Sequence, residues 1–104
     1  MILIREIKSK GKILVTVCDQ NALGKKYKDD VYCLDLIKYR KFYEGKPLNQ
    51  LKKEEVEQML NNASSISVIG NESIEFIKNH GFDVTNKKII GKEEKVTHIN
   101  IYRI

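Results

Sequence analysis

The chain has 104 residues, of which 41% are hydrophobic and 32% charged, and its formal net charge is +5. This length and composition are typical of one soluble globular domain spanning residues 1–104. No window approaches the roughly 18 consecutive apolar residues that a membrane-spanning helix needs. The start, MILIREIKSK, becomes charged too soon for a signal peptide. We therefore expect a cytoplasmic protein with no membrane partner.

The first elements in the chain are predicted to be strands. Residues 2–8 and 12–18 flank the polar stretch SKGK, which is a hairpin signal. Residues 31–37, VYCLDLI, carry apolar side chains on both faces. A strand that is apolar on both faces is typical of the centre of a sheet, so we expect 31–37 to be a central strand.

Helices are predicted in the second half of the chain. In the helix predicted from about Gln50 to Ala63, Val56, Met59 and Leu60 recur at helical spacing. A second helix, ESIEFIKNH, follows the short buried strand 65–70, with Asn71 as its expected N-cap and Gly81 as its stop. Two more strands follow, 87–91 and 95–104. This order predicts an α+β fold, with two main helices packed on a mixed or mostly antiparallel sheet of five to six strands.

The stretch VTVCDQNALGKKYK raises the question of a reactive cysteine. Asp19 follows a strand and is a preferred N-cap residue, QNAL is long enough for one helical turn, and Gly24 stands where a left-handed stop belongs. These roles explain the stretch without catalysis. The alternative, a nucleophilic Cys18, would need a base or a cation close to the thiol. For Cys18 and Cys33 we expect two buried free thiols rather than a disulfide.

The densest positive region lies between residues 25 and 46. KYRKFYEGK interleaves basic residues with aromatic ones, a composition suited to RNA or single-stranded DNA, because basic groups track phosphates and exposed rings stack on bases. We expect Phe42 and Tyr43 to pack into the core. The candidate phosphate contacts are Lys25, Lys26, Lys28, Lys38, Arg40, Lys41 and Lys46.

Other patterns that could carry chemistry are weak. SVIGNES has the strand–glycine–helix outline of a phosphate cradle, but it has one glycine and two nearby acids, so Gly70 is expected only to form the turn. His98 shares its strand face with polar neighbours and is expected to be a semi-buried or surface residue rather than a ligand or base. Cys18, Cys33, His80 and His98 match no zinc spacing, and we expect neither a metal nor another cofactor.

Several short motifs together resemble the small archaeal proteins grouped as domain of unknown function family 424. They are VCDQNALGKKY, LDL, FYEGK, ISVIGNESIEFIKNHG and VTHINI, in order over nearly the whole chain. The resemblance implies a family site that includes Cys18, Asp19, Gly24, Gly70 and His98. Thr97 stands where the family pattern has proline, Ser67 where it has asparagine, and Asn71 interrupts its Gly-Glu pair.

The resemblance implies an archaeal cytoplasmic protein with a translation- or RNA-associated role. Together with the excess of basic residues in the first half, where residues 1–46 hold 11 Lys/Arg against 6 Asp/Glu, it favours a non-enzymatic module that binds RNA or a ribonucleoprotein. The alternative is a protein-interaction subunit that uses an exposed sheet edge or the second helix. The third hypothesis is an enzyme that uses Cys18 and His98. It ranks last because the sequence has no motif for hydrolysis or metal catalysis.

Overall fold

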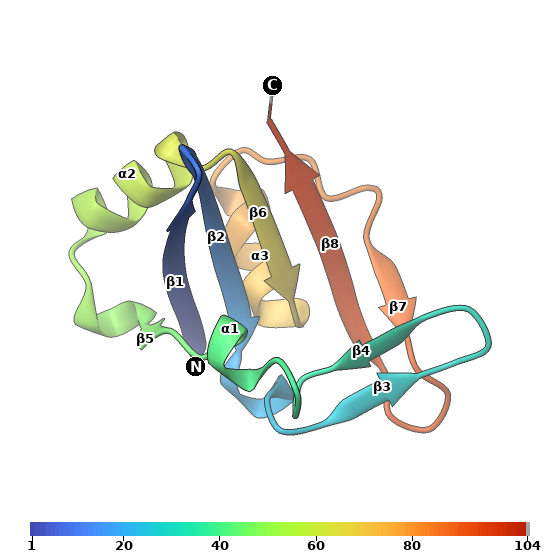
Figure 1. Ribbon diagram of the computed structural model, residues 1–104. Helices are drawn as coiled ribbons and strands as arrows, with labels where there is room; N and C mark the ends of the chain where they lie inside the picture. Colours follow the sequence, from blue (N-terminus) through green and yellow to red (C-terminus); the bar gives the residue numbers. More distant parts are fainter. Residues whose placement is uncertain (104) are drawn as a thin grey trace.

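A six-stranded sheet forms the centre of the computed structural model, which describes residues 1–103 (Figure 1). The strand order is β5-β1-β2-β6-β8-β7. The strands are β1 (Ile2–Ser9), β2 (Lys12–Asp19), β5 (Lys46–Pro47), β6 (Ser65–Ile69), β7 (Lys88–Ile90) and β8 (Val96–Tyr102). Strands β2 and β6 are parallel and the other neighbouring pairs are antiparallel, so the sheet is mixed, as predicted.

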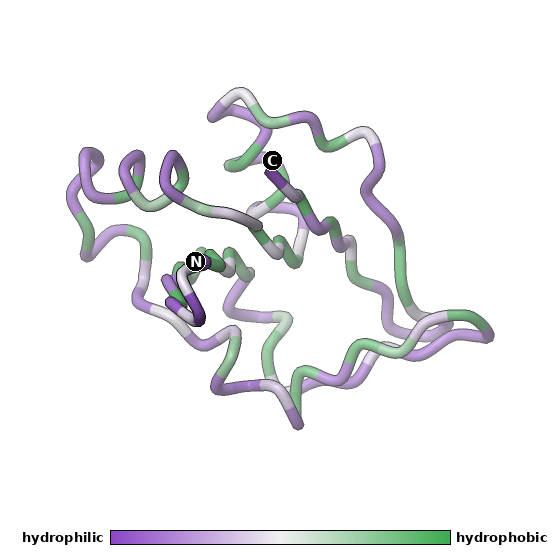
Figure 2. The backbone as a smooth tube through the Cα atoms, turned by 45° about the horizontal axis from the view of Figure 1, so that its top comes forward, coloured by the Kyte–Doolittle hydropathy of each residue, from purple (hydrophilic) through white to green (hydrophobic). Residues whose placement is uncertain are grey.

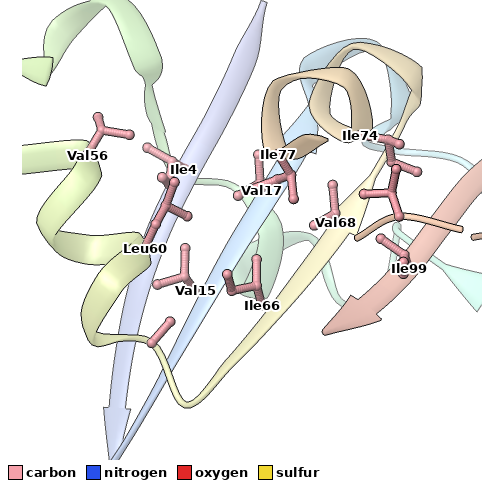
Figure 3. Close-up of a cluster of buried hydrophobic side chains, with 12 residues drawn as sticks. Ile4, Val15, Val17, Val56, Leu60, Ile66, Val68, Ile74, Ile77 and Ile99 are labelled. Carbon is pink, nitrogen blue, oxygen red and sulfur yellow. The ribbon is translucent and has the colours of Figure 1, made fainter. Parts of the chain in front are cut away.

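Two helices cover one face of this sheet. They are α2 (Lys53–Asn62), which follows the short 3-10 turn η2 (Leu48–Gln50), and α3 (Asn71–Asn79). Figure 3 shows Val56 and Leu60 of α2 and Ile74 and Ile77 of α3 directed at the sheet. The strands supply the other side of this core: Ile4, Val15, Val17, Ile66, Val68 and Ile99. Burial of these aliphatic side chains, each worth about 1.5–3 kcal/mol, fixes both helices on the sheet.

The opposite face is covered over part of its area by a second layer. Strands β3 (Lys26–Lys28) and β4 (Cys33–Asp35) form a separate antiparallel two-stranded ribbon, and α1 (Arg40–Tyr43) is a single helical turn. The 3-10 turn η1 (Gln20–Ala22) links β2 to the ribbon. A smaller core lies between this layer and the sheet: Cys18, Ala22, Tyr27, Leu36, Tyr43, Ile69, Ile90 and Val96.

The predicted fold class is confirmed, but the predicted central strand 31–37 is wrong. Only residues 33–35 form a strand, and this strand pairs with β3 outside the main sheet. Val31 and Ile37 are 77% and 62% exposed, so one side of the segment faces solvent. The apolar residues on both faces of the segment predict burial on both sides, but in the structure only Leu34 and Leu36 turn inward. The last predicted strand ends at Tyr102, and residue 104 lies outside the described residues.

The hydropathy of the residues along the chain follows this layering. Figure 2 shows hydrophobic segments in the central strands, a mostly hydrophilic α2, and alternating colour along the β3–β4 ribbon. The radius of gyration of the Cα atoms is 13.1 Å, close to the about 13 Å of a compact domain of this length. In the described part of the chain, no helix is long and apolar enough to cross a membrane.

Candidate nucleic-acid interface

The segment between β4 and β5 carries basic and aromatic side chains on the outside of the molecule. Asp35 turns the chain into α1, because its Oδ1 accepts hydrogen bonds from the backbone N–H groups of Ile37 and Lys38, both at 3.0 Å. These bonds, led by that from Lys38, lower the pKa of Asp35. Such an aspartate-initiated turn is a local device, readable from the sequence DLIK.

Helix α1 is anchored to the sheet by its last residue. The Tyr43 ring is buried, and its hydroxyl lies 3.0 Å from Oγ of Ser67 on β6. The Thr16 hydroxyl on β2 donates a hydrogen bond to the carbonyl of Phe42 at 3.3 Å. These contacts hold the helical turn flat against the middle of the sheet, where it lies in Figure 1. Ser67 therefore has a structural partner in Tyr43.

The core prediction for the two aromatic residues is half right. Tyr43 is buried, but Phe42 is 36% exposed and packs edge-on against Tyr43, with ring centroids 5.1 Å apart. Tyr39 is 51% exposed. Residues 39, 42 and 43 have the i, i+3, i+4 spacing of one helix side, so helical periodicity alone does not decide which ring is buried. The contact of the Tyr43 hydroxyl with Ser67 identifies Tyr43 as the anchor. Tyr39, directly before α1, and Phe42, within it, are thus the two partly exposed rings of this segment.

The basic residues of this segment surround those rings. Lys38, Arg40 and Lys41 are all exposed. The Lys38 ammonium lies 5.3 Å from the Tyr39 ring centroid, and Arg40 pairs with Glu44 at 3.1 Å. Among residues 1–103, neither Lys38 nor Lys41 has a carboxylate partner within ion-pair distance.

The β3–β4 ribbon adds further lysines beside α1. Gly24 has a φ of +76°, and a side chain there would meet the Arg40 guanidinium, so the start of the ribbon lies against α1. Tyr27 points inward and donates a hydrogen bond to the carbonyl of Ala22 at 3.2 Å. The neighbouring residues in the strand, Lys26 and Lys28, are exposed, as expected from the alternation of a strand.

Not every candidate lysine is equally free to bind an anion. Lys25 lies 3.5 Å from Glu94, and the hollow of about 490 Å³ beside the ribbon is lined by two glutamates as well as four lysines. Lys46 belongs to β5 at one edge of the main sheet, whereas the ribbon contacts the opposite edge through Asp29, which accepts the Gly91 N–H at 3.1 Å. Lys26 and Lys38 both lie near Asp35, and Arg40 lies against Gly24, so the structure groups Lys26, Lys38, Arg40 and Lys41 where the ribbon meets α1. Lys28 lies further along the ribbon, and Lys46 lies on β5, three residues beyond α1.

The residues of the expected family site have different structural roles. Asp19 is predicted to cap the turn that follows it, but that turn has no side-chain cap. Its carboxylate instead accepts hydrogen bonds at the start of α3, from the Ser73 N–H at 2.8 Å, the Ser73 hydroxyl at 2.6 Å and the Glu72 N–H at 3.2 Å. The parallel pairing of β2 with β6 brings Asp19 beside this helix start.

Asn71 is consequently not the cap of α3, contrary to the sequence prediction. Its side chain accepts a hydrogen bond from the Thr97 hydroxyl at 2.6 Å, on the exposed surface. Gly70 takes the position before the helix with a φ of +101°, and any Cβ there would overlap the Asp19 carboxylate. The glycine is therefore needed both for its backbone conformation and for the close approach of Asp19.

Cys18 is placed as a structural thiol. Its side chain is fully buried, its Sγ donates to the carbonyl of Asp19 at 3.4 Å, and burial, aided by the Asp19 charge, raises its pKa to about 12. A thiol that stays protonated and unreachable is not a nucleophile at neutral pH. The expectation of two buried thiols is wrong for Cys33, which is exposed on the outer side of β4.

His98 lies in the same cross-strand row as Cys18, with Ile69 between them. Two strand spacings, about 10 Å, separate their backbones, so the thiol and imidazole are not paired. His98 Nε2 is buried without a hydrogen-bond partner among the described residues. Burial lowers the pKa of His98, and Lys88 lowers it further, against a hydrogen bond with Asn100. Among residues 1–103, no group of three His, Cys, Asp or Glu side chains could hold a metal ion.

Comparison with known proteins supports the fold alone. No protein-family model matches the chain, and no curated protein matches it. Among solved structures, the chain is similar to an uncharacterized conserved protein from Methanopyrus kandleri, with 18% sequence identity and a TM-score of 0.72. The match covers 97% of this chain and 90% of that chain. This likeness establishes the α+β architecture.

Proposed function

We propose that this protein is a non-enzymatic module that binds single-stranded RNA across α1 and the β3–β4 ribbon. The proposal rests on the exposure of two aromatic rings among basic residues. Tyr39 lies within the basic segment 38–41, and Phe42 directly follows it. Stacking on an aromatic ring is worth about 1–3 kcal/mol per base, and neighbouring basic groups hold the phosphates between stacked bases. The segment thus supplies both contacts that an unpaired strand requires.

The chemistry favours an unpaired strand over a duplex. Exposed rings can stack only on bases that are not already stacked within a helix. A single helical turn is also too short to enter and read a groove of duplex nucleic acid. The resemblance to family 424, with its expected RNA-associated role, favours RNA over single-stranded DNA.

The lysines of the ribbon and of the segment around α1 set the expected salt dependence. Lys26, Lys28, Lys38 and Lys41 have no ion-pair partner among the described residues. Four phosphate contacts to a single strand predict a slope of log K against log salt of about −2.8. Affinity for a fluorescent single-stranded RNA 12-mer is then expected to fall about 50-fold between 50 and 200 mM salt. Anisotropy titrations measure this directly.

Two sets of variants separate phosphate contacts from stacking. The double variant Lys38→Gln/Lys41→Gln is expected to weaken binding and to reduce the salt slope by about 1.4. Its matched control, Lys53→Gln/Lys78→Gln, makes the same charge change on the helices of the other face and is expected to leave the slope unchanged. Equal loss in both variants would point to non-specific attraction by net charge.

Stacking is tested by Tyr39→Ala and Phe42→Ala. Each is expected to cost about 1–3 kcal/mol of binding free energy without changing the salt slope. Tyr102→Ala, which removes a 76% exposed ring at the far end of β8, is the matched control. A duplex RNA and a DNA 12-mer of the same sequence complete the series. Absence of any RNA binding at low salt, or indifference to both sets of variants, would refute the proposal.

A further inference from the structure

The outer edge of β1 is paired with another strand over only its first part. Strand β5 pairs only with Leu3 and Ile4, so the edge from Arg5 to Ser9 has no neighbouring strand among the described residues. A groove of about 750 Å³ follows this edge, between β1 and residues of α2 such as Gln58 and Met59. Unpaired strand edges are templates for another strand, and β5 with its proline covers only one end.

The backbone groups of this edge can be assigned from the neighbouring strands. Ile13 uses both its N–H and its carbonyl to bond Ser64, at 3.2 and 2.7 Å, so its backbone faces β6. The next residue, Leu14, therefore faces β1, where it pairs with Ile7. Since Ile7 faces β2, the N–H and C=O groups of Glu6 and Lys8 point outward to the open edge.

We propose that β1 pairs with β1 of a second copy of this chain, antiparallel and with the two-fold axis at Ile7. This register places Glu6 opposite Lys8 of the second copy, and Lys8 opposite Glu6 of the second copy. All four residues then direct their free backbone groups at one another, which gives four hydrogen bonds. This contact is isologous, because both copies use the same strand edge, and the pair uses up both edges. The result is a closed dimer with one continuous sheet rather than a filament.

The side chains agree with the same register. Glu6 and Lys8 lie on one face of β1, and within the chain Lys8 Nζ is 3.8 Å from Glu6 Oε1. In the dimer, the two-fold axis places each of them opposite the oppositely charged residue of the second copy, which gives two cross-strand charge pairs. On the other face, the half-buried Ile7 meets Ile7 of the second copy at a position without backbone hydrogen bonds, where side chains approach most closely. A shift of the register by two residues would lose these charge pairs, so the sequence selects a second copy in one alignment.

Charge reversal with complementation tests the register. Sedimentation or light scattering over a concentration series is expected to show a dimer. Glu6→Lys alone and Lys8→Glu alone are each expected to raise its dissociation constant about tenfold, since each brings like charges together twice. An equimolar mixture of the two variants restores opposite pairs and is expected to associate as a heterodimer with near wild-type affinity. A monomeric mass for the wild-type protein up to about 0.5 mM would overturn the proposal, because association is driven by concentration.

Cross-linking at the axis tests the geometry independently of charge. Ile7→Cys in a Cys33→Ser background is expected to form a covalent dimer on mild oxidation, because the axis places the two introduced thiols opposite each other. The matched control, Ser9→Cys in the same background, places the thiols apart and is expected to remain monomeric on a denaturing gel. Dimers that survive both charge reversals, or that cross-link equally at residue 9, would mean that another surface associates. Neither result depends on RNA binding.

Discussion

Replacing Asp19 is expected to be the most damaging single polar substitution in this protein. Its carboxylate belongs to a residue that is 6% exposed, and it accepts three hydrogen bonds from Glu72 and Ser73 at the start of α3. Asp19→Ala would leave two backbone N–H groups and a hydroxyl without this partner. Hydrogen bonds to a charged group are worth about 1.5–3 kcal/mol each, and water can replace only the most exposed one, so we expect a loss of about 3–5 kcal/mol.

Urea unfolding followed by far-ultraviolet circular dichroism measures this loss. With a slope of about 1.5 kcal/mol/M, the midpoint is expected to fall by about 2–3 M at an unchanged slope. Asp19→Asn keeps one acceptor oxygen and should lose about half as much. Ser73→Ala removes one of the three bonds, and a double-mutant cycle with Asp19→Ala should give a coupling free energy of at least about 0.5 kcal/mol. A loss below about 1 kcal/mol for Asp19→Ala would refute the assigned role of this residue.

Further predictions concern the thiols, the histidine and the anchor of α1. A thiol reagent at pH 8 should titrate only Cys33 in the folded protein and both cysteines in urea. Burial raises the pKa of Cys18 from 9.0 to about 12 in the folded protein. The stability that the protonated Cys18 thiol contributes is therefore complete below pH 9 and is lost as the pH rises from 9 to 12. Cys18→Ala should remove that part of the decline in urea midpoints at alkaline pH. Burial lowers the pKa of His98 below 6.5, so the stability contributed by the neutral imidazole is present above pH 6.5 and is lost as the pH falls. His98→Gln should therefore flatten the acid side of the plot of unfolding free energy against pH. An unchanged slope in this variant would contradict the burial of the imidazole. Tyr43→Phe should lower the free energy of unfolding by about 1 kcal/mol, because it leaves the Ser67 hydroxyl without its partner.

Local signals in the sequence predicted most of the elements. The two positive-φ residues of the β1–β2 turn, Lys10 and Gly11, lie in the polar break between two apolar runs. Helices α2 and α3 follow the spacing of their buried residues, and Gly81 ends α3 with a φ of +89°. These features depend on residues within a few positions of one another, which is why periodicity and turn chemistry suffice to find them.

The candidate interface was only partly predictable. The sequence identifies the basic and aromatic composition of residues 38–43, but not which rings are buried. That choice depends on Tyr43 reaching Ser67, which lies 24 positions further along the chain. With Tyr43 as the anchor, Tyr39 and Phe42 are the rings that stay partly exposed. Phe42, which like Tyr43 was expected to pack into the core, therefore becomes a candidate for stacking.

What the sequence by itself determines about this protein is its local structure: the strands, the helices, the turns and the uneven distribution of lysine. Only the tertiary structure decides which residue caps α3 and why Gly70 is glycine. Asp19 is an acceptor in any conformation, but its donors lie more than 50 positions away. They meet because β2 and β6 are parallel neighbours, and the pairing of distant strands depends on packing of the whole domain rather than on any local pattern.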